Sequence, residues 1–148
     1  MAYTQHIVNV EGAIWHDSRY LMVIRGAGED HASGDLSMIG GTLDPVDESS
    51  EDVLVATLKR EIREEVGVAI GMAVYVRSTI FQIPDVPPVY NFIFLCQYTS
   101  GDPYPVDPVE VASVHWLTPD EIMAHPAAQP WTKENIQYCE RKRKDIGW

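Results

Sequence analysis

The chain has 148 residues, a length that favours one domain, so we expect a single domain over residues 1–148. Hydrophobic residues make up 45% of the sequence, which supplies a buried core and excludes disorder as the main state. Lys and Arg number 11 against 22 Asp and Glu, a net charge of −11. This excess argues against long nucleic acid as a partner, because its phosphates would be repelled.

The sequence also predicts a protein outside membranes. No apolar stretch reaches the roughly 20 residues of a membrane span, and residues 1–6 lack the basic and apolar parts of a secretory signal. Cys96 and Cys139 are too few for a disulfide framework and form no C-x-x-C pair. We therefore expect a cytoplasmic protein with two structural thiols and no membrane partner.

The first part of the chain has the pattern of a β-hairpin followed by a short strand. Apolar and β-branched residues fill residues 7–15 and 20–25, with a polar turn between them. After a loop that contains Gly, Glu, Asp and Ser, the apolar run 36–39 ends at Gly40 and Gly41. The two glycines predict a tight turn at this point.

The clearest predicted helix ends at Gly67. Its apolar face consists of residues four positions apart, namely Leu54, Leu58, Ile62 and Val66. Ser49 or Ser50 can cap the start of this helix, and Gly67 can end it.

Three more strands and two helices are expected after Gly67. The strands lie at residues 69–82, 89–99 and 109–117, separated by turns rich in Pro and Gly. Thr118 can cap a short helix with Pro119 at its first position, and Thr132 can cap a final helix that reaches about Lys144. This order of elements predicts an α/β fold of the α+β kind, with a mixed or antiparallel sheet.

The helix before Gly67 carries its charges in an unusual arrangement. On a wheel of about 100° per residue, one flank of Ile62 carries Glu61, Glu64 and Glu65, and the other carries Lys59, Arg60 and Arg63. Carboxylates three and four residues apart repel one another, and Glu64 and Glu65 lie where the helix dipole disfavours anions. A divalent cation, Mg²⁺ or Mn²⁺, would reverse both penalties. A solvated acidic face is the alternative interpretation.

Residues 40–45 and 60–68 together resemble the signature of the Nudix hydrolases, G-x5-E-x7-R-E-U-x-E-E-x-G-U, in which U is aliphatic. The second half of the signature matches at every specified position, and it lies on a predicted helix, which is the context that such a motif requires. The similarity in layout covers nearly the whole chain. It implies a Nudix-like α/β/α sandwich with a mixed central sheet.

The first half of the signature differs in spacing. Gly41 and Arg60 are 19 positions apart, where the signature has 14. Glu48 resembles the first glutamate of the signature by its context, whereas Asp52 stands at the expected spacing of eight before Arg60. Four of the extra residues would add about one turn to the start of the helix and leave its second half intact.

The resemblance implies hydrolysis of the pyrophosphate linkage in a nucleoside diphosphate derivative or a nucleoside triphosphate, by attack of water on phosphorus with Mg²⁺ or Mn²⁺ bound. It assigns the metal to Glu61, Glu64, Glu65 and the Gly41 carbonyl, and structural roles to Gly40, Arg60 and Gly67. Arg60 would pair with a carboxylate; a solvated arginine is the alternative. The candidate catalytic residues are Glu61, Glu64 and Glu110, with Glu61 ranked just above Glu110 as the base.

The substrate and the partners stay open at this level. Pro84 stands 16 residues after Val68, which resembles a marker of ADP-ribose pyrophosphatases, while nucleoside triphosphates and oxidised nucleotides are equally compatible. We expect a small nucleotide as partner, and a homodimer is compatible with the sequence. The rival hypotheses are a nucleotide-sensing module that has the same fold but no hydrolysis, and an acidic structural protein.

Overall fold

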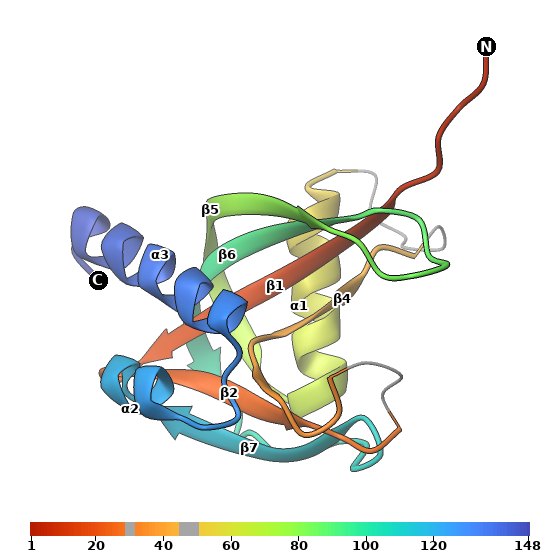
Figure 1. The fold of residues 1–148 in the computed structure, drawn as a ribbon. Coiled ribbons are helices and arrows are strands. Elements are labelled where there is room, and N and C mark those ends of the chain that lie inside the picture. Colours follow the sequence, from red (N-terminus) through yellow and green to blue (C-terminus); the bar gives the residue numbers. More distant parts are fainter. Residues whose placement is uncertain (29–31, 45–50) are drawn as a thin grey trace.

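A computed structural model describes residues 1–28, 32–44 and 51–148. Its elements in chain order are β1 (Ile7–His16), β2 (Arg19–Arg25), β3 (Leu36–Ser37), β4 (Ile39–Thr42), α1 (Val53–Val66), β5 (Ala69–Phe81), β6 (Val89–Ser100), β7 (Val111–Leu117), α2 (Pro119–Ala124) and α3 (Pro130–Ile146). The sheet lies between α1, which is behind it in Figure 1, and α3, which is in front. The predicted α/β/α sandwich is confirmed.

The central sheet is mixed. Its strand order is β3-β2-β1-β6-β5, with β4 also paired to β1 and β7 also paired to β2. The long pair β1–β6 is parallel, whereas β1–β2, β1–β4, β2–β7 and β5–β6 are antiparallel. Of the two sheet types that the sequence left open, the mixed one is therefore correct.

The predicted hairpin joins β1 to β2 through a two-residue turn. Asp17 and Ser18 both have a positive φ, 51° and 65°, a conformation that matches the twist of the flanking strands. The strands pair from Ile14 opposite Leu21 onwards. Beyond this pairing β1 and β2 separate, because β4 pairs with β1 and β3 pairs with β2.

Gly40 and Gly41 lie within β4, so the prediction of a tight turn there is wrong. Gly40 is paired with Glu11 of β1, and Gly41 is paired with Val10. A Cβ atom on Gly40 would lie 1.8 Å from the Val10 carbonyl oxygen. The glycines thus mark a close approach of two backbones. In a sequence, glycines with this function cannot be distinguished from glycines in a turn.

Helix α1 begins at Val53 and ends at Val66. The preceding residue, Asp52, is left-handed (φ 48°, ψ 41°) and its side chain makes no capping hydrogen bond. The predicted caps Ser49 and Ser50 lie outside the described residues. At the other end Gly67, with φ 70°, donates its N–H to the Arg63 carbonyl oxygen, so the predicted C-cap is confirmed.

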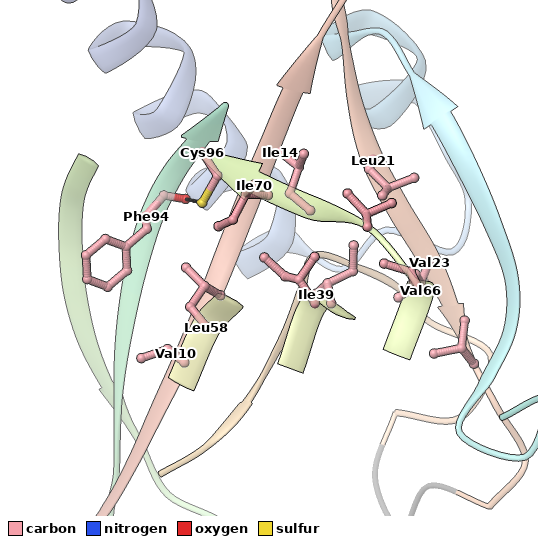
Figure 2. Packing of buried hydrophobic residues seen from close by; sticks show 13 residues of the cluster. Val10, Ile14, Leu21, Val23, Ile39, Leu58, Val66, Ile70, Phe94 and Cys96 are labelled. Atoms are coloured by element: carbon pink, nitrogen blue, oxygen red, sulfur yellow. Dashed lines mark hydrogen bonds between the residues drawn. The ribbon is translucent and has the colours of Figure 1, made fainter. Parts of the chain in front are cut away.

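Two apolar clusters flank the sheet. The first lies between α1 and the sheet, where Leu58, Ile62 and Val66 are fully buried. Figure 2 shows Leu58 and Val66 gathered with side chains of β1 and β2, such as Val10 and Leu21. The four-residue repeat therefore faces the core as predicted, and this packing fixes which face of α1 remains accessible.

The second cluster lies under α2 and α3 and contains Ile122 and Ile136. As predicted, Thr118 caps α2, because its Oγ1 accepts a hydrogen bond from the Glu121 N–H at 3.2 Å. The prediction that Thr132 caps the last helix is wrong. That helix begins at Pro130, whose restricted φ suits the first helical position, and Thr132 is buried inside it.

Both cysteines are buried free thiols. Burial raises the pKa of Cys96, and it raises the pKa of Cys139 to about 12, which makes both thiols unreactive. None of the described helices combines the length and the apolar character that a membrane-spanning helix needs.

Candidate active site

A pocket of about 200 Å³ lies beside the last turn of α1, where β1 and β2 separate. The polar residues and glycines among its lining come from six parts of the chain and include Asn9, Glu11, Arg25, Gly41, Glu65 and Glu110. Gly40 also lines it. Four of the predicted site residues, Gly40, Gly41, Glu65 and Glu110, therefore meet around one pocket.

Glu61 packs against the Gly41 backbone beside this pocket. A Cβ atom on Gly41 would lie 2.3 Å from Cδ of Glu61 and 2.6 Å from its Oε2. The carboxylate is close to the strand because residue 41 has no side chain. The side chain of Glu61 is only 17% exposed as a result. Two of the predicted site residues, Gly41 and Glu61, are therefore in contact.

Arg60 joins two of the predicted carboxylates. Its Nη1 lies 3.2 Å from Oε1 of Glu61 and 3.1 Å from Oε2 of Glu64. The helical wheel placed Arg60 on the opposite flank, but its long side chain reaches across, so the predicted segregation of charges is wrong for this residue. Glu64 is 58% exposed, which makes it the more accessible of the two.

The environment of Glu61 disfavours its charged form. Burial raises the pKa of Glu61, and the charges of Glu64 and Glu110 raise it further, while the charge and hydrogen bond of Arg60 lower it only in part. The influence of Glu110 places that loop residue within electrostatic reach of α1. A positive ion in this position would offset the repulsion among the three carboxylates.

The loop before β7 is attached to the end of α1 by backbone hydrogen bonds. The Tyr104 N–H donates to the Val66 carbonyl oxygen, and the Val106 N–H donates to the Glu65 carbonyl oxygen, both at 3.1 Å. These bonds satisfy carbonyl groups that the end of a helix leaves without a partner. The loop thereby has a fixed position relative to Glu65.

The other end of the same loop is attached to the end of β2. The Gly26 N–H donates to the Glu110 carbonyl oxygen at 2.7 Å, and the Gly28 N–H donates to the Val109 carbonyl oxygen at 2.9 Å. A Cβ atom on Gly26 would lie 2.1 Å from the Val109 carbonyl oxygen. Glu110 is thus held between α1 and β2, at the edge of the pocket.

Sequence reasoning missed three polar residues of β1 and β6. Asn9 and Glu11 line the pocket, and the Asn9 Nδ2 donates to the Asn91 Oδ1 at 2.7 Å. Burial raises the pKa of Glu11, whereas a hydrogen bond from Asn91 and the charge of Arg25 lower it. The signal in the sequence was two polar residues at alternate positions of an otherwise apolar strand.

The remaining predicted residues lie apart from the pocket. Asp52 precedes α1, so the helix separates it from Glu65 by about 20 Å at 1.5 Å per residue, and Glu48 lies outside the described residues. Gly67 packs against the Tyr104 ring, because a Cβ atom on Gly67 would lie 2.7 Å from Cε1 of Tyr104. Within residues 1–28, 32–44 and 51–148, no three acidic, histidine or cysteine side chains are gathered closely enough to enclose a metal ion.

Comparison with known proteins shows which of them this chain resembles. A model of the NUDIX domain matches residues 6–139, whereas no curated protein matches the sequence. Two solved structures with a similar fold are the MutT NUDIX hydrolase from Burkholderia pseudomallei and the MutT protein from Methanosarcina mazei Go1. The first has a TM-score of 0.76 at 23% identity and covers 90% of this chain and 98% of its own.

The second has a TM-score of 0.77 at 20% identity, covering 97% of this chain and 99% of its own. A UDP-X diphosphatase is also similar, with a TM-score of 0.73 at 20% identity, over 99% of this chain and 66% of the longer one. These structures show a shared fold. The domain match over residues 6–139 goes further, and with it the chain belongs to the NUDIX family.

Proposed function

We propose that the chain is a divalent-metal-dependent hydrolase that cleaves the pyrophosphate linkage of a nucleoside diphosphate derivative or a nucleoside triphosphate by attack of water on phosphorus. One observation carries the proposal: Glu65 of α1 and Glu110 of the loop before β7 line one pocket, beside Glu61, whose pKa is raised by burial and by the charges of Glu64 and Glu110. Membership in the NUDIX family supports it, as do neighbours named MutT NUDIX hydrolase and UDP-X diphosphatase.

The donor set suits Mg²⁺ or Mn²⁺, which prefer oxygen ligands. Glu61, Glu64 and Glu65 offer carboxylate oxygens, and the Gly41 carbonyl is a fourth candidate ligand. Arg60 pairs with both Glu61 and Glu64, and the exposed side chain of Glu64 can turn from this arginine to an ion. A bound ion would neutralise the phosphates of the substrate, which a chain with a net charge of −11 otherwise repels.

Glu61 is the preferred general base. A carboxylate accepts a proton more readily when its pKa is raised, and burial together with Glu64 and Glu110 raises the pKa of Glu61. Glu110 is the alternative base, because it lines the pocket and is attached at both ends of its loop. Arg25, which lines the same pocket, supplies a positive charge for a phosphate group.

Product formation from a panel of nucleotides tests this proposal. The panel contains ADP-ribose, nucleoside triphosphates, an oxidised dGTP and a dinucleoside polyphosphate, each with Mg²⁺, Mn²⁺ or a chelator. We expect turnover that requires metal and that falls by about a hundredfold or more in Glu65→Gln. The matched control is Glu134→Gln, on α3, whose carboxylate is 57% exposed and pairs with Arg77; it retains full activity.

A nucleotide-sensing module is the second candidate, favoured by the pairing of Arg60 with two of the carboxylates. This module would bind a nucleotide tightly and release no product, with the protein folded and metal present. That result would replace hydrolysis as the function. If metal changes neither the nucleotide affinity nor the melting temperature, both candidate functions are contradicted.

A further inference from the structure

Two residues of the pocket, Asn9 and Glu11, are connected through Asn91 by hydrogen bonds between two strands. β1 and β6 are parallel, with Asn9 opposite Asn91, and Glu11 lies two residues further on the same face of β1. The Asn9 Nδ2 donates to the Asn91 Oδ1 at 2.7 Å, and Asn91 in turn hydrogen-bonds to Glu11. Asn91 is 4% exposed and does not line the pocket, so it holds the two pocket residues from within the protein.

Asn9 and Glu11 keep further hydrogen-bond donors and acceptors that a ligand in the pocket can use. A carboxamide has two N–H donors and one carbonyl acceptor, and a carboxyl group has two oxygens. The bond to Asn91 uses one N–H of Asn9, which leaves that residue a donor and an acceptor. Asn91 engages Glu11 through a single hydrogen bond, which leaves acceptor capacity on the carboxyl group. Both residues line the pocket.

We propose that Asn9 and Glu11, positioned by Asn91, recognise hydrogen-bond donors on the nucleoside part of the substrate and thereby determine which nucleotide is accepted. This inference rests on the proposed function, because it assumes a nucleotide in the pocket. The donors are of two kinds, an amino group of the base or a hydroxyl group of the ribose. Asn carboxamides and Asp or Glu carboxylates recognise the first kind, and carboxylates recognise the second.

The chemistry of Glu11 favours an N–H or O–H group of the substrate beside it rather than a phosphate. A carboxyl oxygen of Glu11 accepts a hydrogen bond from an N–H or O–H group but repels a phosphate oxygen. Arg25 suits the phosphates instead, as would a divalent cation held by the carboxylate of Glu65. The pocket volume of about 200 Å³ is below the roughly 300–1,000 Å³ of pockets that enclose a whole ligand, so it accommodates part of a nucleotide.

Gly40 and Gly41 add no side chain to the pocket. Both line the pocket, and neither can carry a Cβ without contacting Val10 or Glu61 at under 3 Å. Glu11 is paired with Gly40 across the β1–β4 ladder. A ligand in the pocket can therefore approach both Glu11 and Glu65.

Binding of non-hydrolysable analogues tests the proposal without depending on turnover. The dissociation constants of α,β-methylene triphosphates are measured with Mg²⁺ by titration calorimetry, in three pairs that each differ by one donor group. The pairs are adenine against purine, guanine against hypoxanthine, and ribose against 2′-deoxyribose. We expect the wild-type protein to favour the member with the donor by about tenfold or more in at least one pair.

The variants Glu11→Gln and Asn9→Ala should bring that ratio close to one, while Glu134→Gln leaves it unchanged. The pair that changes identifies the donor as an amino or a hydroxyl group. A purely structural defect would instead weaken both members of a pair equally and leave their ratio intact. If Glu11→Gln does not fold, as judged by circular dichroism and thermal unfolding, Asn9→Ala provides the test by itself.

Two results would overturn the inference. One is a wild-type protein that does not distinguish any pair; the other is a wild-type ratio that persists in the folded variants. If metal-dependent hydrolysis is observed alongside either result, the proposed function stands and only the role of Asn9 and Glu11 fails. If the protein binds no nucleotide with metal present, both fail together.

Discussion

Two clusters of Arg and Glu side chains, one on α1 and one on α3, contain the same residue types but shift the pKa of a glutamate in opposite directions. On α3, Arg143 donates from Nε to Oε1 of Glu140 at 2.7 Å and from Nη2 to Oε2 at 2.9 Å. The Tyr20 hydroxyl donates to the same carboxylate at 2.6 Å. Burial alone would raise the pKa of Glu140, but these hydrogen bonds outweigh it and lower the pKa.

On α1, one arginine serves two carboxylates. Arg60 contacts both Glu61 and Glu64 through the same Nη1 atom, and Glu110 adds a third negative charge nearby. Burial together with these charges raises the pKa of Glu61. The α3 cluster thus has a full set of donors, whereas the α1 cluster has excess negative charge.

This difference separates a structural ion pair from a candidate active site. Perturbed carboxylates with unbalanced charge tend to occur where a ligand supplies what the fold lacks. The α3 cluster connects the last helix to β2, and Arg143 also donates to the Trp148 carbonyl oxygen at 2.6 Å. Substitutions in the two clusters should therefore affect different properties, activity at α1 and stability at α3.

The largest expected effect is on the contact between β4 and α1. In Gly41→Ala the new Cβ would lie 2.3 Å from Cδ of Glu61, so the carboxylate must move. Because a displacement of about 1 Å can reduce turnover about a hundredfold, we expect a loss of that order in kcat/KM. Steady-state hydrolysis of the best substrate from the panel measures it.

Gly71→Ala is the matched control for this substitution. A Cβ at Gly71 of β5 would meet the Thr99 Oγ1 of β6 at 3.7 Å, an ordinary van der Waals contact. This variant should retain wild-type activity. Equal activity of Gly41→Ala and the wild-type protein would show that the position of Glu61 against β4 is unimportant for turnover.

The next effect concerns stability at α3. Glu140→Gln weakens the hydrogen bonds from Arg143 and Tyr20, and hydrogen bonds to charged groups contribute about 1.5–3 kcal/mol. We expect a loss of this size in the free energy of unfolding at pH 7, measured by urea denaturation, with activity unchanged. Glu134→Gln, whose carboxylate is 57% exposed in its pair with Arg77, should lose less than about 1 kcal/mol.

The effect at Glu140 should also depend on pH in a defined direction. The folded state lowers the pKa of Glu140 below its ordinary value of 4.5. The stabilisation is therefore complete above that value and is lost as the pH falls through the lowered pKa. The difference between wild type and Glu140→Gln should narrow below pH 4.5, and a constant difference down to strongly acidic pH would contradict this explanation.

The smallest expected effect is a gain in stability, in contrast to the loss expected for Glu140→Gln. Glu61→Gln removes a charge that the fold disfavours, so in the presence of a chelator it should raise the free energy of unfolding by up to about 1 kcal/mol. Mg²⁺ should then stabilise the wild-type protein more than the variant, because the variant lacks one candidate ligand. Thermal unfolding with and without Mg²⁺ measures both effects. A destabilised variant would mean that the bond to Arg60 outweighs the repulsion.

Sequence patterns within a few residues predicted much of the fold. The repeat that includes Leu58 and Ile62 and the glycine at residue 67 predicted the core face and the end of α1, because helical spacing and a left-handed cap are local properties. The same pattern placed Glu61 and Glu65 on one flank. Local signals failed where two nearby residues could each begin a helix. Pro130 begins α3, two residues before Thr132, which the sequence identified as the cap.

Contacts between distant segments decided the rest of the candidate site. The tertiary structure brings Asn91 to Asn9, 82 residues away in sequence, attaches the Glu110 loop to the end of α1, and makes Gly41 the contact point for Glu61. The sequence by itself determined which carboxylates lie on the same flank of α1, because helical periodicity fixes their spacing. Only the packing of α1, β1, β4 and the loop before β7 determined which of them face the pocket, because strand pairing and burial depend on residues far apart in the chain.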